Sequence, residues 1–481
     1  MANTVAAELV FIPAPGVGHI MSTIQMAKLL VNRDPRLLVT VLLMNSPYPV
    51  PALTTYIESL AKNSIERIRF IEVPQDHTPP QLAPKAFLLS FYEFINSHCK
   101  YVRNVVADLI NQPSSSKVVG FVVDLFCTSM IDVANEFNVP TYVFFTSNAA
   151  FLGFDLYIER LCVDKNQDHV IQLSNSEGEI VVPSFVNPVP MTAFPSEYQM
   201  KEGLDVLIGT FRELRKAKGI MVNTFLELET HAIKSFHDTS FPPVYPVGPI
   251  LNLDGIVGEE EEAHERDVIS WLDGQPPLSV VVLCFGSAGS LNEVQVKEIA
   301  LGLERSGYRF VWSLRLAPHL EQSFDDPRVL LPEGFLTRTI GLGKVIGWAP
   351  QVSLLAHEAV GGFVSHCGWN SILESLWFGV PMATWPMYAE QQLNAFKMVV
   401  EWGLAVDLKM DYKMGTFNPD ANTVIVKAEE IERVIKRLMD DNEIRARVKS
   451  MSKLSRETVA EGGSSYASVG YLVQEITSNI I

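Results

Sequence analysis

The fold is decided by residues 348–391, which read WAPQVSLLAHEAVGGFVSHCGWNSILESLWFGVPMATWPMYAEQ. Residues 361–365 form a short apolar run that predicts a buried strand, and residues 370–378 predict the helix that follows it. A turn containing Gly368 lies between them, and the sequence VPMATWP beyond the helix predicts another strand. A strand, a turn, a helix and a second strand in this order are typical of a parallel α/β sheet.

The start of the predicted helix indicates an anion site. A helix that begins after a glycine-containing turn presents free backbone N–H groups and the positive end of the helix dipole, and both favour a phosphate group. Asn370 and Ser371 stand at this start, where their side chains either cap the helix or bind the anion. His366 adds a further hydrogen-bond donor in the turn.

Other residues extend this site on both sides. Glu374 lies one turn into the predicted helix, and a carboxylate there accepts hydrogen bonds from both hydroxyls of a ribose. Trp348 offers an aromatic plane and Gln351 an amide, while Glu390 and Gln391 follow the second strand. Together these residues predict a base-stacking ring, a phosphate site, a ribose site and polar groups beyond them. The ligand that fits this series is a nucleoside diphosphate sugar.

Strand and helix patterns alternate along the rest of the chain. This alternation predicts two doubly wound, Rossmann-like domains of the α/β class. Two domains are also expected from the length of 481 residues, which is long for a single core. The predicted strands cover residues 9–13, 38–44, 69–73, 118–123, 141–145 and 219–223 in the first half, and 279–285, 310–314 and 344–347 in the second.

Two segments are predicted to be irregular. Residues 161–198 are rich in Pro and Ser, which favours a binding loop or a mobile lid over core structure. Residues 246–262 contain glycines and a run of glutamates at 259–262, which predict a solvated linker. We therefore expect an N-terminal domain over residues 1–248, a linker over 249–275 and a second domain over 276–462.

The composition limits the partners. Apolar residues make up 47% of the chain and the net charge is −17, so a globular protein is expected and nucleic acid or an anionic membrane is not. The five cysteines form no CxxC pair, which favours free thiols in a reducing compartment. The first residues do not resemble a signal peptide and no apolar run has the length of a membrane helix, so we expect a cytoplasmic protein.

A second polar motif, Gly16-Val17-Gly18-His19, follows the first predicted strand. It lacks the third glycine of a dinucleotide fingerprint, which argues against NAD. His19 stands at the carboxyl edge of the sheet, and Asp124 ends another predicted strand at the same edge. The two residues predict a general base and the carboxylate that orients it. The alternatives are a structural histidine and, for Asp124, a cap for the segment near Thr128.

Residues 348–391 resemble the signature box of the plant secondary-product UDP-glycosyltransferases. The length of the stretch matches that box, as do the sequence HCGWNS, Glu374 and the closing pair Glu390-Gln391. An ordinary α/β core unit explains the apolar strands but not these polar residues together. The resemblance implies the GT-B fold, in which two doubly wound domains face each other across a cleft. It also implies that a last helix, within residues 463–481, crosses back to the first domain.

The resemblance implies a role for each site residue. His19 would take the proton of an acceptor hydroxyl and Asp124 would orient His19, with UDP-glucose as co-substrate and without a metal or other cofactor. Gln391 at the end of the box indicates glucose as the sugar. The implied donor contacts are Trp348 to uracil, Gln351 to the ribose or base edge, Glu374 to the ribose diol, Ser287, His366, Asn370 and Ser371 to the phosphates, and Trp369, Glu390 and Gln391 to the sugar, with Ala349, Gly368, Tyr388 and Thr146 completing the set.

The acceptor site is predicted to be aromatic. Phe126, Phe151, Phe194 and Tyr198 are its expected wall, and such a wall suits a small apolar acceptor with a hydroxyl group, such as a flavonoid, another phenolic or a terpenoid. The resemblance thus implies an inverting glucosyltransferase that forms β-glucosides, and we expect it to be a monomer. The alternative is a catalytically silent protein that only binds nucleotide sugars, and the presence of both His19 and Asp124 favours the enzyme.

Overall fold

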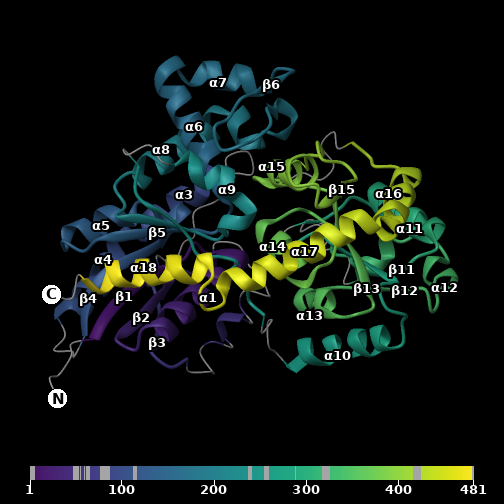
Figure 1. Cartoon of the computed structure of the whole chain (residues 1–481), viewed down its shortest axis with the longest axis horizontal. Coiled ribbons are helices and arrows are strands. Elements are labelled where there is room, and N and C mark those ends of the chain that lie inside the picture. The colour runs from purple at the N-terminus through teal and green to yellow at the C-terminus, as the bar shows by residue number, and fades with distance from the viewer. Residues whose placement is uncertain are drawn as a thin grey trace.

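The computed structural model of the chain describes residues 6–46, 54, 56–58, 60, 65–75, 87–111, 116–236, 241–253, 259–287, 289–316, 326–414 and 424–478. Residues 254–258 of the expected linker lie outside these ranges. Figure 1 shows two α/β halves side by side, with the N-terminal half on the left and most of the C-terminal half on the right. The predicted fold class is thus confirmed: each half contains its own parallel sheet.

The N-terminal domain is built on a seven-stranded sheet in the order β3-β2-β1-β4-β5-β8-β9. Alternate side chains of a strand point to opposite faces, so Val10 and Ile12 pack into one core while Leu9 and Phe11 pack into the other. Every pairing described in this sheet is parallel. The strands are β1 (Ala6–Ile12), β2 (Leu37–Leu43), β3 (Ile68–Glu72), β4 (Ser116–Asp124), β5 (Thr141–Phe145), β8 (Gly219–Val222) and β9 (Val244–Pro246).

Helices cover both faces of this sheet. The helix after β1 packs through Ile20, Ile24 and Ala27 on the face that also receives the last helix of the chain. The helices are α1 (Val17–Arg33), α3 (Phe87–Ser97), α4 (Cys99–Asn111), α5 (Met130–Glu136), α6 (Ala149–Lys165), α7 (Gln167–Ser174), α8 (Lys201–Leu214) and α9 (Leu226–Ser235).

The segment 161–198 is more ordered than the sequence predicted. It contains the end of α6, all of α7, and a two-stranded ribbon of β6 (Glu179–Ile180) and β7 (Val189–Pro190). Phe185, Phe194 and Tyr198 are buried and belong to the domain core. The prediction of a loop outside the core was wrong, because scattered aromatic residues in a Pro-rich stretch bury themselves against α6 without any regular spacing.

The C-terminal domain repeats the design with a six-stranded parallel sheet in the order β12-β11-β10-β13-β14-β15. Its strands are β10 (Val280–Cys284), β11 (Arg309–Ser313), β12 (Gly343–Ile346), β13 (Val360–Ser365), β14 (Met382–Thr384) and β15 (Ala405–Asp407). Its helices are α10 (Glu259–Asp273), α11 (Glu293–Ser306), α12 (Phe335–Arg338), α13 (Gln351–Ala356), α14 (Trp369–Phe378), α15 (Gln391–Phe396), α16 (Ala428–Asp440) and α17 (Asn442–Val459).

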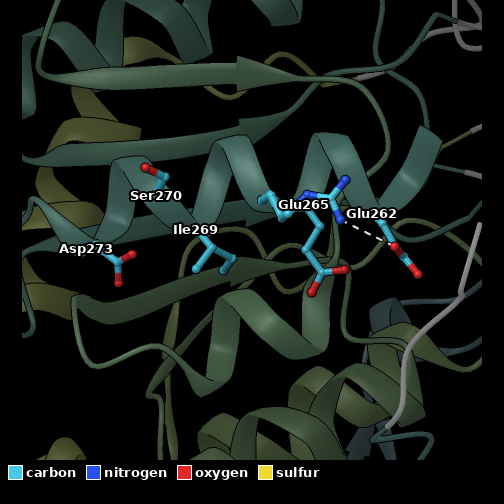
Figure 2. Close-up of a pocket in the computed structure, with 6 residues that line it drawn as sticks. Glu262, Glu265, Ile269, Ser270 and Asp273 are labelled. Carbon is cyan, nitrogen blue, oxygen red and sulfur yellow. Dashed lines mark hydrogen bonds and ion pairs between the residues drawn. The ribbon is translucent and has the colours of Figure 1, made fainter. Parts of the chain in front are cut away.

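The expected linker over 249–275 is largely helical. Its second part is α10, which packs against the C-terminal domain: Asp267 pairs with Lys344 and Glu265 accepts a hydrogen bond from Ser353 on α13. The boundary predicted at residue 275 therefore falls too late. Figure 2 shows the residues of α10 that line a hollow, and none of them is a residue that the sequence assigned to a site. Its lining residues are Glu262, Glu265, Arg266, Ile269, Ser270 and Asp273.

The last helix, α18 (Ser464–Ser478), lies on the N-terminal domain. In Figure 1, α17 and α18 form the yellow ribbons that run from the C-terminal half to the N-terminal half. The Tyr142 hydroxyl donates to Glu475 at 3.2 Å, and the guanidinium of Arg33 lies 3.5 Å from the ring centre of Tyr466. The end of the chain thus fastens the two domains together.

Direct hydrogen bonds also join the domains. Trp369, the first residue of α14, donates its indole N–H to the carbonyl oxygen of Asn223 at 2.6 Å. Glu401, which is buried in the C-terminal domain, accepts from the backbone N–H groups of Val186 and Asn187 at 2.7 and 3.0 Å. These contacts bring the carboxyl edge of one sheet against that of the other.

Candidate active site

His19 and Asp124 meet at the carboxyl edge of the N-terminal sheet. His19 lies in the first turn of α1, directly after β1, and Asp124 ends β4. Because β1 and β4 are neighbours, with Ile12 opposite Val123, their ends bring the two side chains together. His19 Nδ1 lies 2.7 Å from Asp124 Oδ2. A side chain at Gly16 would lie 3.2 Å from the imidazole, so the glycine allows the ring to approach the backbone.

Asp124 contacts both His19 and the start of a short helical turn, and its role as an orienting carboxylate stays a prediction. Its Oδ2 faces His19, while its Oδ1 accepts the backbone N–H of Phe126 at 3.0 Å and caps the short helical turn Leu125–Cys127. The Thr146 hydroxyl lies 3.2 Å from His19 Nδ1. Thr146 therefore belongs to the His19 cluster, and its expected contact with the donor is not supported by this arrangement.

The charge of Asp124 sets the state of the imidazole. Burial lowers the pKa of His19, but the charge of Asp124, its hydrogen bond and the charge of Glu390 together raise it more, so the pKa lies above its ordinary value. With Asp124 at Nδ1, the proton of the neutral ring belongs on that nitrogen. The remaining nitrogen, Nε2, is then an acceptor, which is the form that a general base requires.

Opposite His19 lies the start of α14. Gly368 caps this helix in an extended conformation, and no side chain makes a capping hydrogen bond there. Asn370 instead donates to the carbonyl oxygen of Gly18 at 3.4 Å and to the Ser22 hydroxyl at 3.1 Å, both on α1. Asn370 therefore does not cap its own helix, which was one of the two roles that the sequence offered, and its binding to an anion stays a prediction. The amide links α14 to the segment that carries His19, so the predicted phosphate site and the predicted base are neighbours.

His366 is neutral at physiological pH. Burial and the charge of Arg315 lower the pKa of His366 to about 4. Its ring is packed between two glycines: a side chain at Gly286 would lie 2.3 Å from its Nε2, and one at Gly368 would lie 2.5 Å from the same atom. Ser287, in the turn beyond β10, is exposed. A neutral imidazole is a hydrogen-bond donor to a phosphate oxygen rather than a countercharge.

Gln351 and Glu374, both expected at the nucleoside, form a hydrogen-bonded group with Ser371, which was expected at the phosphates. Gln351 donates through Nε2 to the Ser371 hydroxyl at 2.9 Å and to Glu374 Oε2 at 2.6 Å. Burial raises the pKa of Glu374 to about 7, although the bond from Gln351 lowers it in part. Trp348 lies half-buried beside this group, just beyond the end of β12.

This pKa leads to a test with uridine, which has no phosphate that titrates near neutrality. We expect uridine affinity to fall by about tenfold as the pH drops from 8 to 6, since protonated Glu374 accepts fewer hydrogen bonds from the ribose. Glu374→Gln should bind more weakly at pH 8 and show no such pH dependence. Calorimetric titration at several pH values measures both. Parallel pH profiles for the two proteins would show that Glu374 does not bind the ribose.

The residues expected to contact the sugar already make hydrogen bonds to other groups of the protein. The Oε1 atom of Gln391 accepts from the backbone N–H groups of Met387 and Tyr388 at 2.9 and 3.1 Å, which leaves its amide N–H₂ group as the part that points elsewhere. Glu390 accepts from the Ser147 hydroxyl of the N-terminal domain at 3.1 Å. The indole N–H of Trp369 is hydrogen-bonded across the domain interface. A contact of Trp369 with the sugar nucleotide would therefore have to come from its backbone N–H.

The expected acceptor wall divides into two groups. Phe126 is half-buried, and its ring centre lies 5.5 Å from that of His19, so it stands at the predicted base. Phe194 and Tyr198 are 0% and 1% exposed and pack edge-to-face on Phe154, so these two are corrected to core residues. Phe151, with 9% exposure, lies near that core as well.

Two polar features near the site were not singled out from the sequence, namely Arg315 and the Asn148–Asn394 pair. Arg315 follows β11 at the same sheet edge as Ser287 and Trp348, and it contacts the loop that contains Ser287. Asn148 donates to Asn394 at 2.6 Å across the domain interface, close to Glu390. The position of Arg315 at a strand end was a usable signal. The Asn148–Asn394 pair had none, because the two residues are far apart in sequence and belong to different domains.

No group of His, Cys, Asp and Glu side chains with the arrangement of a metal site occurs within the described ranges. Among the same residues, no helix is both long and apolar enough to cross a membrane. The residues at the site are thus hydrogen-bonding groups, aromatic rings and two helix starts.

Two facing Rossmann-like domains define the GT-B class of glycosyltransferases, and here one domain carries a helix start, an aromatic ring and a half-buried carboxylate while the other carries a His–Asp pair. The chain belongs to the UDP-glucoronosyl and UDP-glucosyl transferase family, whose pattern matches residues 46–457. This membership confirms the family that residues 348–391 resembled.

Similar proteins come from several plants. UDP-glucose flavonoid 3-O-glucosyltransferase 6 of Fragaria ananassa is 49% identical over 98% of this chain and 99% of its own. UDP-glycosyltransferase 101 of Panax ginseng is also 49% identical, with the same coverage. A Medicago truncatula crystal structure complexed with UDP-glucose superposes with a TM-score of 0.87 at 42% identity over 99% of both chains. A transferase from Siraitia grosvenorii in complex with UDP gives 0.84 at 45% identity over 98% of this chain and 100% of its own.

Proposed function

We propose that this protein transfers glucose from UDP-glucose to a hydroxyl group of a small apolar plant metabolite and forms a β-glucoside. The observation that carries the proposal is the contact between His19 and Asp124 at 2.7 Å, next to a helix start that Asn370 ties to the same segment. A base and a predicted diphosphate site in contact with one another are what transfer from a nucleotide sugar requires.

In the proposed reaction His19 Nε2 takes the proton of the acceptor hydroxyl as the oxygen attacks the anomeric carbon. The bond from that carbon to the diphosphate breaks on the opposite face, so the configuration inverts and UDP leaves. Asp124 holds the ring in the correct tautomer and stabilises the imidazolium that forms. The N–H groups at the start of α14, together with His366 and Ser287, stabilise the charge on the departing UDP.

The donor pose follows from the order of groups along the C-terminal sheet edge. Uracil stacks on Trp348, the ribose diol binds Glu374, and the diphosphate lies at the start of α14. Glucose then reaches Glu390 and Gln391, where Ser147 holds Glu390 from the other domain. The Medicago truncatula structure with UDP-glucose, at 42% identity over nearly the whole chain, supports the choice of donor.

The acceptor we propose is a flavonoid, another phenolic or a terpenoid. Phe126 beside His19 supplies an apolar surface at the base, and the name of the Fragaria ananassa relative specifies a flavonoid. The described cysteines are all free, which fits the proposed cytoplasmic location. We further propose that the protein acts as a monomer and needs no cofactor besides the donor.

The test is incubation of the purified protein with UDP-glucose and a panel of flavonols, simple phenols and terpenoid alcohols, followed by mass spectrometry. We expect a mass gain of one hexose on at least one phenolic acceptor. The proton coupling at the anomeric carbon of the product should correspond to a β-glucoside. Binding of UDP without product on any acceptor would favour the silent binding protein, and an α-glucoside would overturn inversion.

A further inference from the structure

Arg315 makes an unusual set of contacts at the donor site. It lies two residues beyond the end of β11, between the ends of β10 and β12. Its Nη1 donates to the carbonyl oxygen of Ser287 at 2.6 Å, and its Nη2 donates to those of Gly286 and Gly289, the latter at 3.0 Å. Its guanidinium carbon lies 5.6 Å from the ring centre of Trp348. The guanidinium of Arg315 therefore contacts both the turn after β10 and the ring of Trp348, which is expected to stack on the base.

Gly286 and Gly289, the two glycines whose carbonyl groups accept from Arg315, lie in tightly restricted surroundings. Gly286 has a φ of 74°, in the left-handed region, and a side chain there would collide with His366. A side chain at Gly289 would lie 2.0 Å from the carbonyl oxygen of Phe285. The two glycines let the loop fold tightly between Arg315 and His366, and the guanidinium then fixes its carbonyl groups.

Fixing the carbonyl groups also fixes the N–H groups. In a trans peptide the carbonyl of one residue and the N–H of the next point in opposite directions. The carbonyls of Gly286 and Gly289 point at Arg315, so the N–H groups of Ser287 and Ser290 point away from it. Backbone N–H groups that a turn presents together form anion sites in proteins.

We propose that Arg315 is a positioning residue for the donor, whose guanidinium fork holds the carbonyl groups of Gly286, Ser287 and Gly289 so that Ser287 and its N–H group meet the diphosphate. Arg315 acts through the loop rather than by its charge on the phosphates. This inference rests on the proposed UDP-sugar site, and nothing in the sequence pattern had assigned a role to this residue.

The test compares Arg315→Gln and Arg315→Lys in calorimetric binding of UDP and of uridine. Lysine keeps the charge but lacks the planar fork that reaches several carbonyls at once. We expect the Kd for UDP to rise about 10- to 100-fold in both variants, from the loss of hydrogen bonds to a charged group. The Kd for uridine should change by less than about threefold on the same scale. In turnover, KM for UDP-glucose should rise while KM for the acceptor stays unchanged.

Arg338→Gln provides the matched control. Arg338 is a half-exposed arginine of the same domain that pairs with Glu304, away from the loop, and its loss should leave the UDP Kd as in the unmodified protein. Wild-type affinity in Arg315→Lys would overturn the proposal, because charge alone would then suffice. Equal losses for UDP and uridine would overturn it too. If Arg315→Gln does not fold, the lysine variant decides alone, and a wild-type protein that does not bind UDP would refute the proposed function itself.

Discussion

Replacing His19 with glutamine is expected to slow sugar transfer by roughly 10²–10⁴-fold while UDP binding stays nearly unchanged. Glutamine keeps a polar side chain next to Asp124 but cannot take the acceptor proton. The groups proposed to hold the nucleotide, Trp348 and Glu374, come from the other domain, so their contacts remain. Single-turnover product analysis measures the chemical step, and calorimetry with UDP measures binding.

Asp124→Asn is the companion variant, because it changes the base without removing it. The pKa of His19 lies above its ordinary value, since the charge and hydrogen bond of Asp124, together with the charge of Glu390, outweigh the lowering by burial. The base works in its neutral form, so kcat/KM falls as the pH drops through this pKa. Without the charge of Asp124 that pKa falls, and the acidic limb of the profile should move to lower pH. Lost UDP affinity with preserved turnover in His19→Gln would instead place His19 in the donor site.

The alternation of strand and helix patterns predicted the fold class because parallel strands are buried on both faces and stand out as apolar runs. The two short edge strands β9 and β15 were missed, since each has three residues and no clear pattern. The segment 161–198 was misjudged for a different reason. Phe185, Phe194 and Tyr198 are buried by long-range packing, which local composition does not record.

At the site, too, local patterns were predictable and long-range contacts were not. His19 and Asp124 were expected to meet because each follows a strand at one sheet edge, and in the structure they are in contact, although their roles stay a prediction. Contacts between domains could not be read from the sequence. Asn370 lies at the helix start as expected, but its bonds to α1 were not foreseen, nor was the bond from the indole of Trp369 to Asn223. Such pairs depend on how the domains sit together, which no local motif encodes.

The second large effect concerns the choice of sugar. UDP-glucose is expected to exceed UDP-galactose in kcat/KM by a factor on the order of 10–1,000, from one or two hydrogen bonds lost on epimerisation of a hydroxyl group. Gln391 is 4% exposed, and its Oε1 is held by the N–H groups of Met387 and Tyr388. Its N–H₂ group therefore has a fixed direction and cannot rotate to suit the other epimer.

Two variants separate the contributions of this side chain. Gln391→Glu retains an oxygen for the N–H groups of Met387 and Tyr388 but has no N–H₂ to offer, so it should lose rate with UDP-glucose and keep the loop intact. Gln391→His should reduce the ratio of kcat/KM between UDP-glucose and UDP-galactose, with a large loss of total activity.

A buried N–H group left without an acceptor costs more free energy than its hydrogen bond contributes. The preference for one sugar can therefore depend on a single amide. The measurement is kcat/KM for both donors with one fixed acceptor in all three proteins. Equal values for the two sugars in the unmodified enzyme would show that Gln391 does not select the sugar, and selection would then have to reside in Glu390 and the Ser147 hydroxyl that holds it.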